Sequence, residues 1–244
     1  MKLWTDTALN QLPVNRGFRL RGESMTRLEV FSDAAFAFAV TTLVVTGGEI
    51  PGNYDELIIA LKKVPSFVLS FAQIIVFWIT HRSWSRRYGL EDFWTTFLSM
   101  AMVFTILVYV FPLRLIFSLF ISFVIAPGWF PAEFEATSQE EILGLFIIYG
   151  AGFSILSAIL MFLYVRSYQC KQSLGLNLYE QNYTKLGIGI WAIQLFVGLA
   201  SAATAWLMPV AIGMFSPFLY FILPIAIPFC VHHYEKQARL LQDV

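Results

Sequence analysis

Runs of apolar residues, separated by short polar stretches, recur along the whole chain. A helix that crosses the roughly 30 Å hydrocarbon layer of a membrane needs about 20 mostly apolar residues, because it rises about 1.5 Å per residue. Six runs are long enough, and they cover residues 25–46, 57–81, 93–117, 142–165, 186–207 and 210–231. The pattern predicts an all-α membrane protein with six transmembrane helices per subunit.

Prolines and one arginine interrupt two of these runs. Pro112 is expected to kink the third span, and Arg114 just beyond it is expected to snorkel outward to water. Pro217, Pro224 and Pro228 are expected to bend the sixth span, which a membrane tolerates where neighbouring helices satisfy the freed carbonyls.

The two ends of the chain are polar. Residues 1–23 carry basic side chains but no apolar core, so they are interpreted as a tail and not as a cleaved signal peptide. Residues 24–234 then form one six-helix transmembrane domain, and residues 235–244 form a short C-terminal tail.

Lysine and arginine are distributed unevenly around the six predicted spans. Thirteen of the 16 basic residues fall on one side of the membrane, and the exceptions are Lys62, Lys63 and Arg114. Because cytoplasmic loops carry the excess of Lys and Arg, both termini and both tails are expected in the cytoplasm. The sequence therefore predicts a multi-pass protein of the cell membrane, embedded in the lipid bilayer.

The composition agrees with this class and excludes others. Hydrophobic residues make up 58% of the chain and charged residues 13%, whereas soluble domains contain roughly 25% charged residues. Sixteen basic and 16 acidic residues leave no excess charge for nucleic-acid binding. Two cysteines and three histidines, without the spacing of a metal site, indicate no resident metal, and no cofactor-binding motif is present. We expect neither an enzyme nor a bound cofactor.

Ionisable side chains inside the first span set it apart from the others. Arg27 and Asp33 lie in an apolar helix, where an unpaired charge is costly. Asp33 is therefore either a functional group or part of a buried cluster that fixes helix packing. At about 100° per residue it points about 140° away from Phe38, which favours packing. Phe38 belongs to a stripe roughly 80° wide, which is where a pathway for a solute is expected; its members are Arg27, Phe31, Ala34, Phe38, Thr42 and Val45.

Several motifs resemble those of one known family. Arg27-x-x-x-Phe31-Ser32-Asp33 at the start of the first span is similar to the signature of the transmembrane protein 175 family, the lysosomal potassium channels and their prokaryotic relatives. Trp78-x-x-His81-Arg82, Glu91-Asp92 and Phe111-Pro112 also resemble segments of that family. The resemblance covers residues 24–117.

The resemblance implies a potassium channel without a re-entrant pore loop, and the string Thr-Val-Gly-Tyr-Gly is absent from this chain too. In prokaryotic members four subunits form a homotetramer, and the first helix of each lines the pore. Carried over to this sequence, the constriction positions are Phe38, Thr42 and Val45, and Thr41 matches a threonine of the filter region. Potassium would be the permeant ion and the only, transient, metal.

The resemblance also implies a structural network behind the pore helix. Its members here are Arg27, Phe31, Ser32, Asp33, Trp78, His81 and Asp92. His81 is expected to pair with Asp33 or Asp92 and to hold the first helix upright. Phe38 and Thr42 stand where the family commonly has isoleucine or leucine, so we expect a narrower ring and an added ring of hydroxyls.

A proton- or ion-coupled secondary transporter is the main alternative. Such a protein needs ionisable groups near the membrane midplane and often contains paired repeats. The sequence shows no internal repeat, and Asp33 is its only deep carboxylate. An intramembrane enzyme would need a cluster of catalytic groups within the bilayer, whereas the His, Asp and Glu residues lie mostly at span ends.

Overall fold

The computed structural model describes residues 4–45 and 50–240. Within them, six segments are long and apolar enough to span a membrane: Arg27–Val45, Val64–Tyr88, Phe93–Ile125, Gln139–Gln169, Leu178–Leu207 and Val210–Tyr234. The prediction of six spans is confirmed.

The described chain is mostly helical. In order, its elements are α1 (Asp6–Gln11), β1 (Val14–Asn15), β2 (Phe18–Arg19), α2 (Arg27–Val45), α3 (Tyr54–Lys62), α4 (Val64–Tyr88), α5 (Phe93–Phe120), the π-helix η1 (Ile121–Ile125), α6 (Gln139–Gln169), α7 (Leu178–Leu207), α8 (Val210–Gly213), the 3-10 helix η2 (Ser216–Ile222) and α9 (Leu223–Leu240).

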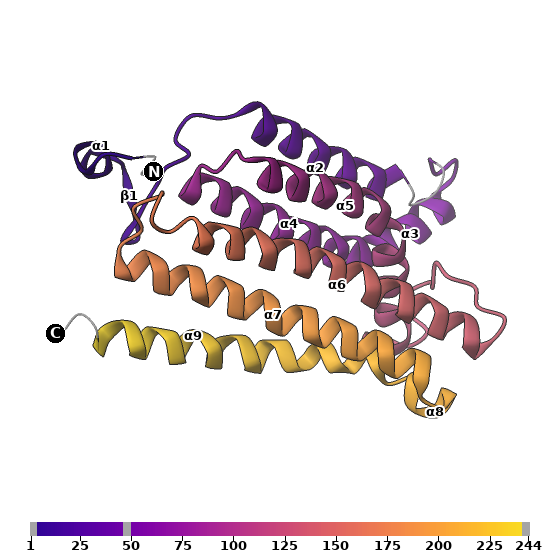
Figure 1. The fold of residues 1–244 in the computed structure, drawn as a ribbon. Helices are drawn as coiled ribbons and strands as arrows, with labels where there is room; N and C mark the ends of the chain where they lie inside the picture. Colours follow the sequence, from indigo (N-terminus) through magenta and orange to yellow (C-terminus); the bar gives the residue numbers. More distant parts are fainter. Residues whose placement is uncertain (1–3, 46–49, 241–244) are drawn as a thin grey trace.

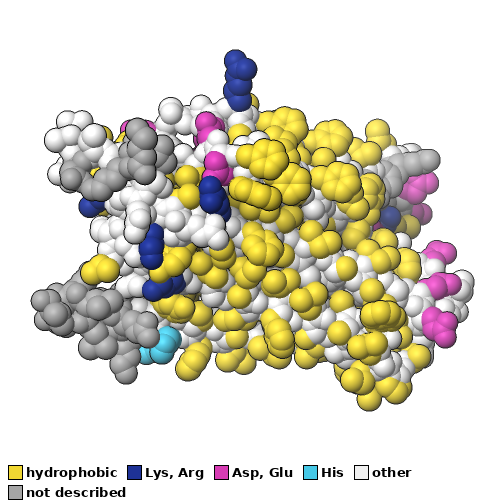
Figure 2. All heavy atoms as spheres, in the orientation of Figure 1, with side chains coloured by type: hydrophobic (Ala, Val, Ile, Leu, Met, Phe, Trp, Pro, Cys, Tyr) yellow, Lys and Arg dark blue, Asp and Glu magenta, His cyan; other side chains and the backbone are white. Residues whose placement is uncertain are grey.

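The spanning helices lie side by side, with α2 at one edge of the bundle and α9 at the other (Figure 1). Helices α5 and α6 occupy the middle, where α5 contacts α2 on one side and α6 on the other. α1 and the C-terminal end of α9 lie at the same end of the bundle (Figure 1). Hydrophobic side chains cover most of the visible face, and acidic side chains gather at the end opposite α1 (Figure 2).

The second span begins later than predicted. The apolar run from residue 57 was expected to continue unbroken, but α3 ends at Lys62 and α4 starts at Val64. The Lys63 N–H bonds to the carbonyls of Ala60 and Leu61, and Pro65 in the first turn of α4 lacks an N–H donor. The spanning helix then continues to Tyr88 instead of ending at 81, which keeps its length at 25 residues.

The third and sixth spans also differ from the prediction in length. Helix α5 runs through Pro112 to Phe120 and continues as a π-helix to Ile125. The sixth span is divided into α8, η2 and α9, with Pro217 in the first turn of η2 and Pro228 inside α9. Helix α9 reaches Leu240, beyond the predicted start of a C-terminal tail at 235, and residues 241–244 of that tail lie outside the described residues.

Residues 4–23, expected to be a polar tail, form α1 and a small antiparallel hairpin that packs onto the bundle. Phe18 is 2% exposed and meets the ring of Tyr88 edge to face, with the ring centroids 5.4 Å apart. The N–H of Gly22 donates to the carbonyl of Arg86 at the end of α4, at 3.0 Å. The segment that leads into α2 is therefore fixed to the helix ends.

Candidate functional site

Helix α2 is buried on one face only. Four residues at helical spacing turn into the bundle: Ser32, Phe36, Ala39 and Leu43. On the other side Phe31 is 51% exposed, Phe38 63% and Val45 70%. A large exposed apolar face on a helix that carries polar anchors marks a contact with lipid or with another protein.

Asp33 lies between these faces and turns towards α4, as the helical geometry predicted. Its Oδ1 accepts a hydrogen bond from the indole Nε1 of Trp78 at 2.7 Å. The guanidinium of Arg82 lies over the Trp78 ring, 5.2 Å from its centroid. Asp33 thus anchors α2 to the second span, and its side chain is directed away from the exposed stripe.

The hydrogen-bond partner of His81 is neither Asp33 nor Asp92. Its Nε2 shares a hydrogen bond with the Ser99 hydroxyl on α5, at 3.0 Å, and the histidine is 4% exposed. Trp78, one turn earlier on α4, donates to Oδ1 of Asp33. His81 therefore joins α4 to α5 and makes no hydrogen bond with α2.

Asp92 caps α5 and ties it to α6. Its Oδ1 accepts from the Thr95 N–H at 2.9 Å, and its Oδ2 accepts from Nε of Arg166 at 2.7 Å. Burial alone would raise the pKa of Asp92, but the bonds from Thr95 and Arg166 outweigh it and hold this pKa below its usual value. Asp33, His81 and Asp92 therefore make hydrogen bonds with three different sets of partners, while His81 and Asp33 still interact electrostatically.

The start of α2 carries a reciprocal cap that the sequence analysis missed. The N–H of Thr26 donates to the Glu29 carboxylate, and the N–H of Glu29 donates to the Thr26 hydroxyl, each at 3.3 Å. The spacing of threonine and glutamate three residues apart was the available signal. Of the remaining motif residues, Arg27 and Phe31 are exposed and Ser32 is buried.

The predicted constriction residues differ in how far they are exposed. Phe38, Thr41 and Val45 lie on the exposed face, whereas Thr42 is half-buried. Both threonine hydroxyls donate to backbone carbonyls one turn earlier, Thr41 to Ala37 and Thr42 to Phe38, at 3.0 Å. A hydroxyl that gives its proton to the backbone keeps its oxygen lone pairs as acceptors. Thr41 therefore presents an oxygen to whatever covers this face.

Arg114 does not snorkel outward. Its side chain is 6% exposed, and Nη2 donates to Oε1 of Glu133 at 2.9 Å. Its Nη1 donates to the backbone carbonyl of Leu43 in the last turn of α2. A buried carboxylate and a helix end compensate the charge here, so the side chain has no need to reach water.

A second buried ion pair lies at the opposite end of the bundle. Nη2 of Arg21 donates to Oε2 of Glu180 at 2.8 Å, and both side chains are 0% exposed. The other carboxylate oxygen of Glu180 accepts from the N–H of Arg19 at 2.9 Å. These contacts fasten the segment before α2 to the start of α7. Among the described residues, no three His, Cys, Asp or Glu side chains are placed to hold a metal ion.

Six apolar spans and a first helix with one uncovered face define a multi-pass helical membrane protein. Comparisons with known proteins identify its family. Residues 27–112 match the model of the endosomal/lysosomal potassium channel TMEM175 family. A protein of Marivirga tractuosa described as a potassium channel is 34% identical over 240 residues, which cover 94% of this chain and 96% of that relative.

A solved structure has the same fold. The crystal structure of a variant of the potassium channel MtTMEM175, in complex with a Nanobody-MBP fusion protein, matches 92% of this chain and 100% of that chain. The TM-score is 0.80 and the sequence identity 30%. The chain belongs to the TMEM175 family of potassium channels.

Proposed function

We propose that this chain is one subunit of a homotetrameric potassium channel of the cell membrane, with the exposed face of α2 lining the pore. The observation that supports this assignment best is the uncovered stripe on α2, which places Phe38 and the Thr41 oxygen together on the face opposite the helix's packed residues. Family membership supports the choice of ion.

The residues on this face suit passage of a weakly hydrated cation. Four Phe38 side chains around an axis would form an apolar ring, and an ion that crosses it must shed or reshape its water shell. Potassium binds its water shell less strongly than sodium does, so it loses less hydration free energy at the ring. The Thr41 oxygens, one turn further along the helix, would replace part of the lost water as acceptors. The same ring would close the pore by dewetting when it narrows.

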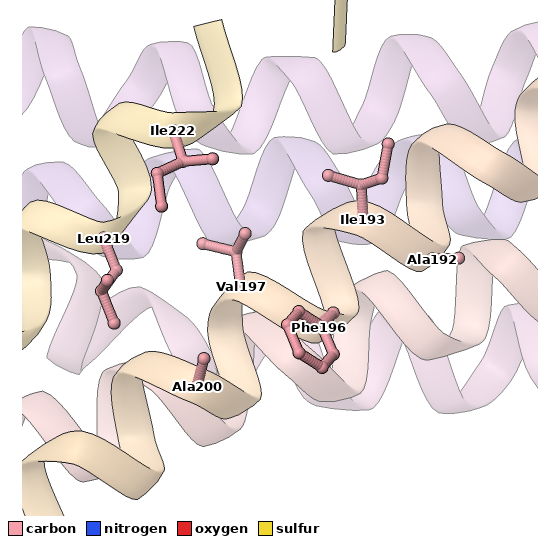
Figure 3. Close-up of a pocket in the computed structure, with 7 residues that line it drawn as sticks. All are labelled: Ala192, Ile193, Phe196, Val197, Ala200, Leu219 and Ile222. Carbon is pink, nitrogen blue, oxygen red and sulfur yellow. The ribbon is translucent and has the colours of Figure 1, made fainter. Parts of the chain in front are cut away.

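Among the described residues, the groove on the far side of the subunit differs from this face of α2. A groove of about 520 Å³ lies between α7 and η2, and only alanine, isoleucine, phenylalanine, valine and leucine side chains line it (Figure 3). None of these side chains carries a hydroxyl or a charge that could replace water around an ion. Phe196 in this groove is 73% exposed, about as much as Phe38 on α2. Exposure alone therefore does not distinguish a pore from a lipid contact, and the exposed Thr41 oxygen is what supports the choice of α2.

Ion flux into liposomes tests the assignment. The purified protein is reconstituted, and potassium-driven flux is compared for the wild type, Phe38→Ala and the matched variant Phe196→Ala. Removal of the Phe38 ring widens the apolar constriction, so Phe38→Ala should conduct faster and leak more sodium. Phe196→Ala should match the wild type. Equal flux and selectivity in all three proteins would remove Phe38 from the pore.

Single-channel recording distinguishes a channel from a coupled transporter. Unitary current steps in planar bilayers are expected, because a carrier turns over too slowly to produce them. Saturable, proton-driven uptake without unitary steps would contradict the proposal.

A further inference from the structure

The C-terminal end of α2 is held by a group of three residues that we name the α2 latch: Leu43, Arg114 and Glu133. Arg114 contacts both others at once, with Nη1 on the Leu43 carbonyl and Nη2 on Glu133. Carbonyls in the last turn of a helix carry partial negative charge, and a buried guanidinium there is well placed to bind them. The latch thus joins α2, α5 and the loop after η1.

Helix α5 fixes both charged members of the latch. Arg114 and Ser118 are four residues apart on α5, so they lie on the same face. The N–H of Glu133 donates to the Ser118 hydroxyl at 2.7 Å, and Ser118 is 1% exposed. The bond from the Glu133 backbone to Ser118 therefore fixes the position of the Glu133 carboxylate. Because Arg114 donates to that carboxylate, its guanidinium has little freedom to move. The position of the guanidinium in turn determines where the Leu43 carbonyl lies.

Stability alone explains this arrangement poorly. A buried ion pair often contributes no more to folding than apolar side chains of the same volume would. A planar guanidinium fork, in contrast, fixes the direction of two acceptors at the same time. Leu43 lies two residues from Thr41 and two from Val45, both on the exposed face of α2. A shift of the Leu43 carbonyl would therefore move both side chains.

We propose that Arg114 is a positioning residue for ion selection, which sets the distance of the Thr41 and Val45 rings from the pore axis through the Leu43 carbonyl. This inference rests on the proposed function, because it assumes that α2 lines the pore. The charge of Glu133 balances that of Arg114, so the latch orients the helix without adding net charge near the end of the pore. The latch therefore affects the ratio of potassium to sodium permeability and does not determine whether cations can enter the pore.

The test compares three variants by reversal potential under mixed potassium and sodium gradients. The double variant Arg114→Leu/Glu133→Leu removes both charges of the ion pair together, and the bond to Leu43 is lost. Arg114→Lys keeps the positive charge without the fork. Glu135→Gln is the matched control, because it removes a carboxylate from the same loop at an exposed position. Thermal unfolding in detergent reports folding for each protein.

The double variant should unfold near the wild-type temperature, conduct, and show a potassium-to-sodium permeability ratio several-fold lower. Arg114→Lys should give an intermediate ratio, and Glu135→Gln the wild-type ratio. A folded double variant with wild-type selectivity would overturn the inference. If the double variant does not fold, Arg114→Lys decides: a lower ratio supports the inference and a wild-type ratio overturns it.

The outcomes also separate this inference from the proposed function. A wild-type protein that shows no selective cation conduction refutes the proposed function. A selective wild-type channel whose selectivity is unaffected by the latch variants refutes the inference alone.

Discussion

Two phenylalanines, two residues apart on α2, have opposite environments. Phe36 is 3% exposed and packs within the bundle core, whereas Phe38 is 63% exposed in the same helix. The two faces of α2 are both apolar, so hydrophobicity does not explain why the subunit covers one and leaves the other. The polar groups differ between the two sides: Asp33 turns towards α4, and Thr41 is exposed.

Under the proposed function, this contrast would let one helix serve both folding and conduction. Residues on the covered face are constrained by packing within the subunit. Residues on the exposed face are not, and in an assembled channel they would face the pore or neighbouring subunits. Variants on the covered face should therefore change stability, and variants on the exposed face should change ion flux or selectivity.

The largest expected effect comes from the two phenylalanines themselves. Phe36→Ala should lower the free energy of unfolding by about 3–5 kcal/mol, because it leaves a cavity in the core. Phe38→Ala should change the stability of the subunit much less, since its ring is exposed within it. Denaturant unfolding in detergent, followed by tryptophan fluorescence, measures both. An equal loss of stability in the two variants would break the comparison.

Asp33, which lies between the two faces, provides a smaller test. Asp33→Ala leaves the Trp78 N–H without its acceptor, which should cost about 1–3 kcal/mol of unfolding free energy. Asp33→Asn keeps an oxygen in the same place and should lose less. The same unfolding measurement serves for both. If the asparagine variant is as unstable as the alanine variant, the negative charge and not the hydrogen bond anchors α2.

A change of selectivity with little change of stability is expected at Thr41. Thr41→Val keeps the shape of the side chain but removes the oxygen that would bind a partly dehydrated ion. The potassium-to-sodium permeability ratio should fall, and Thr41→Ser should retain it. Thr42→Val is the matched comparison, and its effect should be smaller because Thr42 is half-buried. Reversal potentials that are identical for Thr41→Val and the wild type would exclude the hydroxyl from ion selection.

Much of the fold could be predicted from the sequence because membrane insertion depends on length and apolarity, which are local properties. The same is true of the direction of Asp33, which follows from the helical repeat. The boundary between α3 and α4 was missed, because residues 57–81 are apolar enough to read as one continuous run. The end of the third span was ambiguous from the sequence, because the apolar run continues past residue 117 to Ala126, and the π-helix lies in that stretch.

The buried ion pairs could not be predicted, because their partners are far apart in the sequence. Arg21 and Glu180 are separated by 159 residues, and Arg114 and Glu133 by 19. Because the sequence does not show which carboxylate each arginine pairs with, Arg21 was interpreted as part of a polar tail and Arg114 as a side chain that snorkels to water. The sequence placed Thr42 on the exposed stripe, but Thr42 is half-buried. The exposed stripe on α2 is centred closer to Thr41 than the helical wheel predicted.

Accessibility of position 38 to a water-soluble reagent tests the central claim most directly. Cys170 and Cys230 are free cysteines, so both are first replaced by serine and a single cysteine is then introduced at Phe38, Phe36 or Phe196. Potassium flux is recorded before and after a charged thiol reagent is added. If α2 lines the pore, flux should fall for Phe38→Cys and remain unchanged for Phe36→Cys and Phe196→Cys. Unchanged flux for Phe38→Cys, with the reagent shown to leave its thiol unmodified, would contradict a pore on this face of α2.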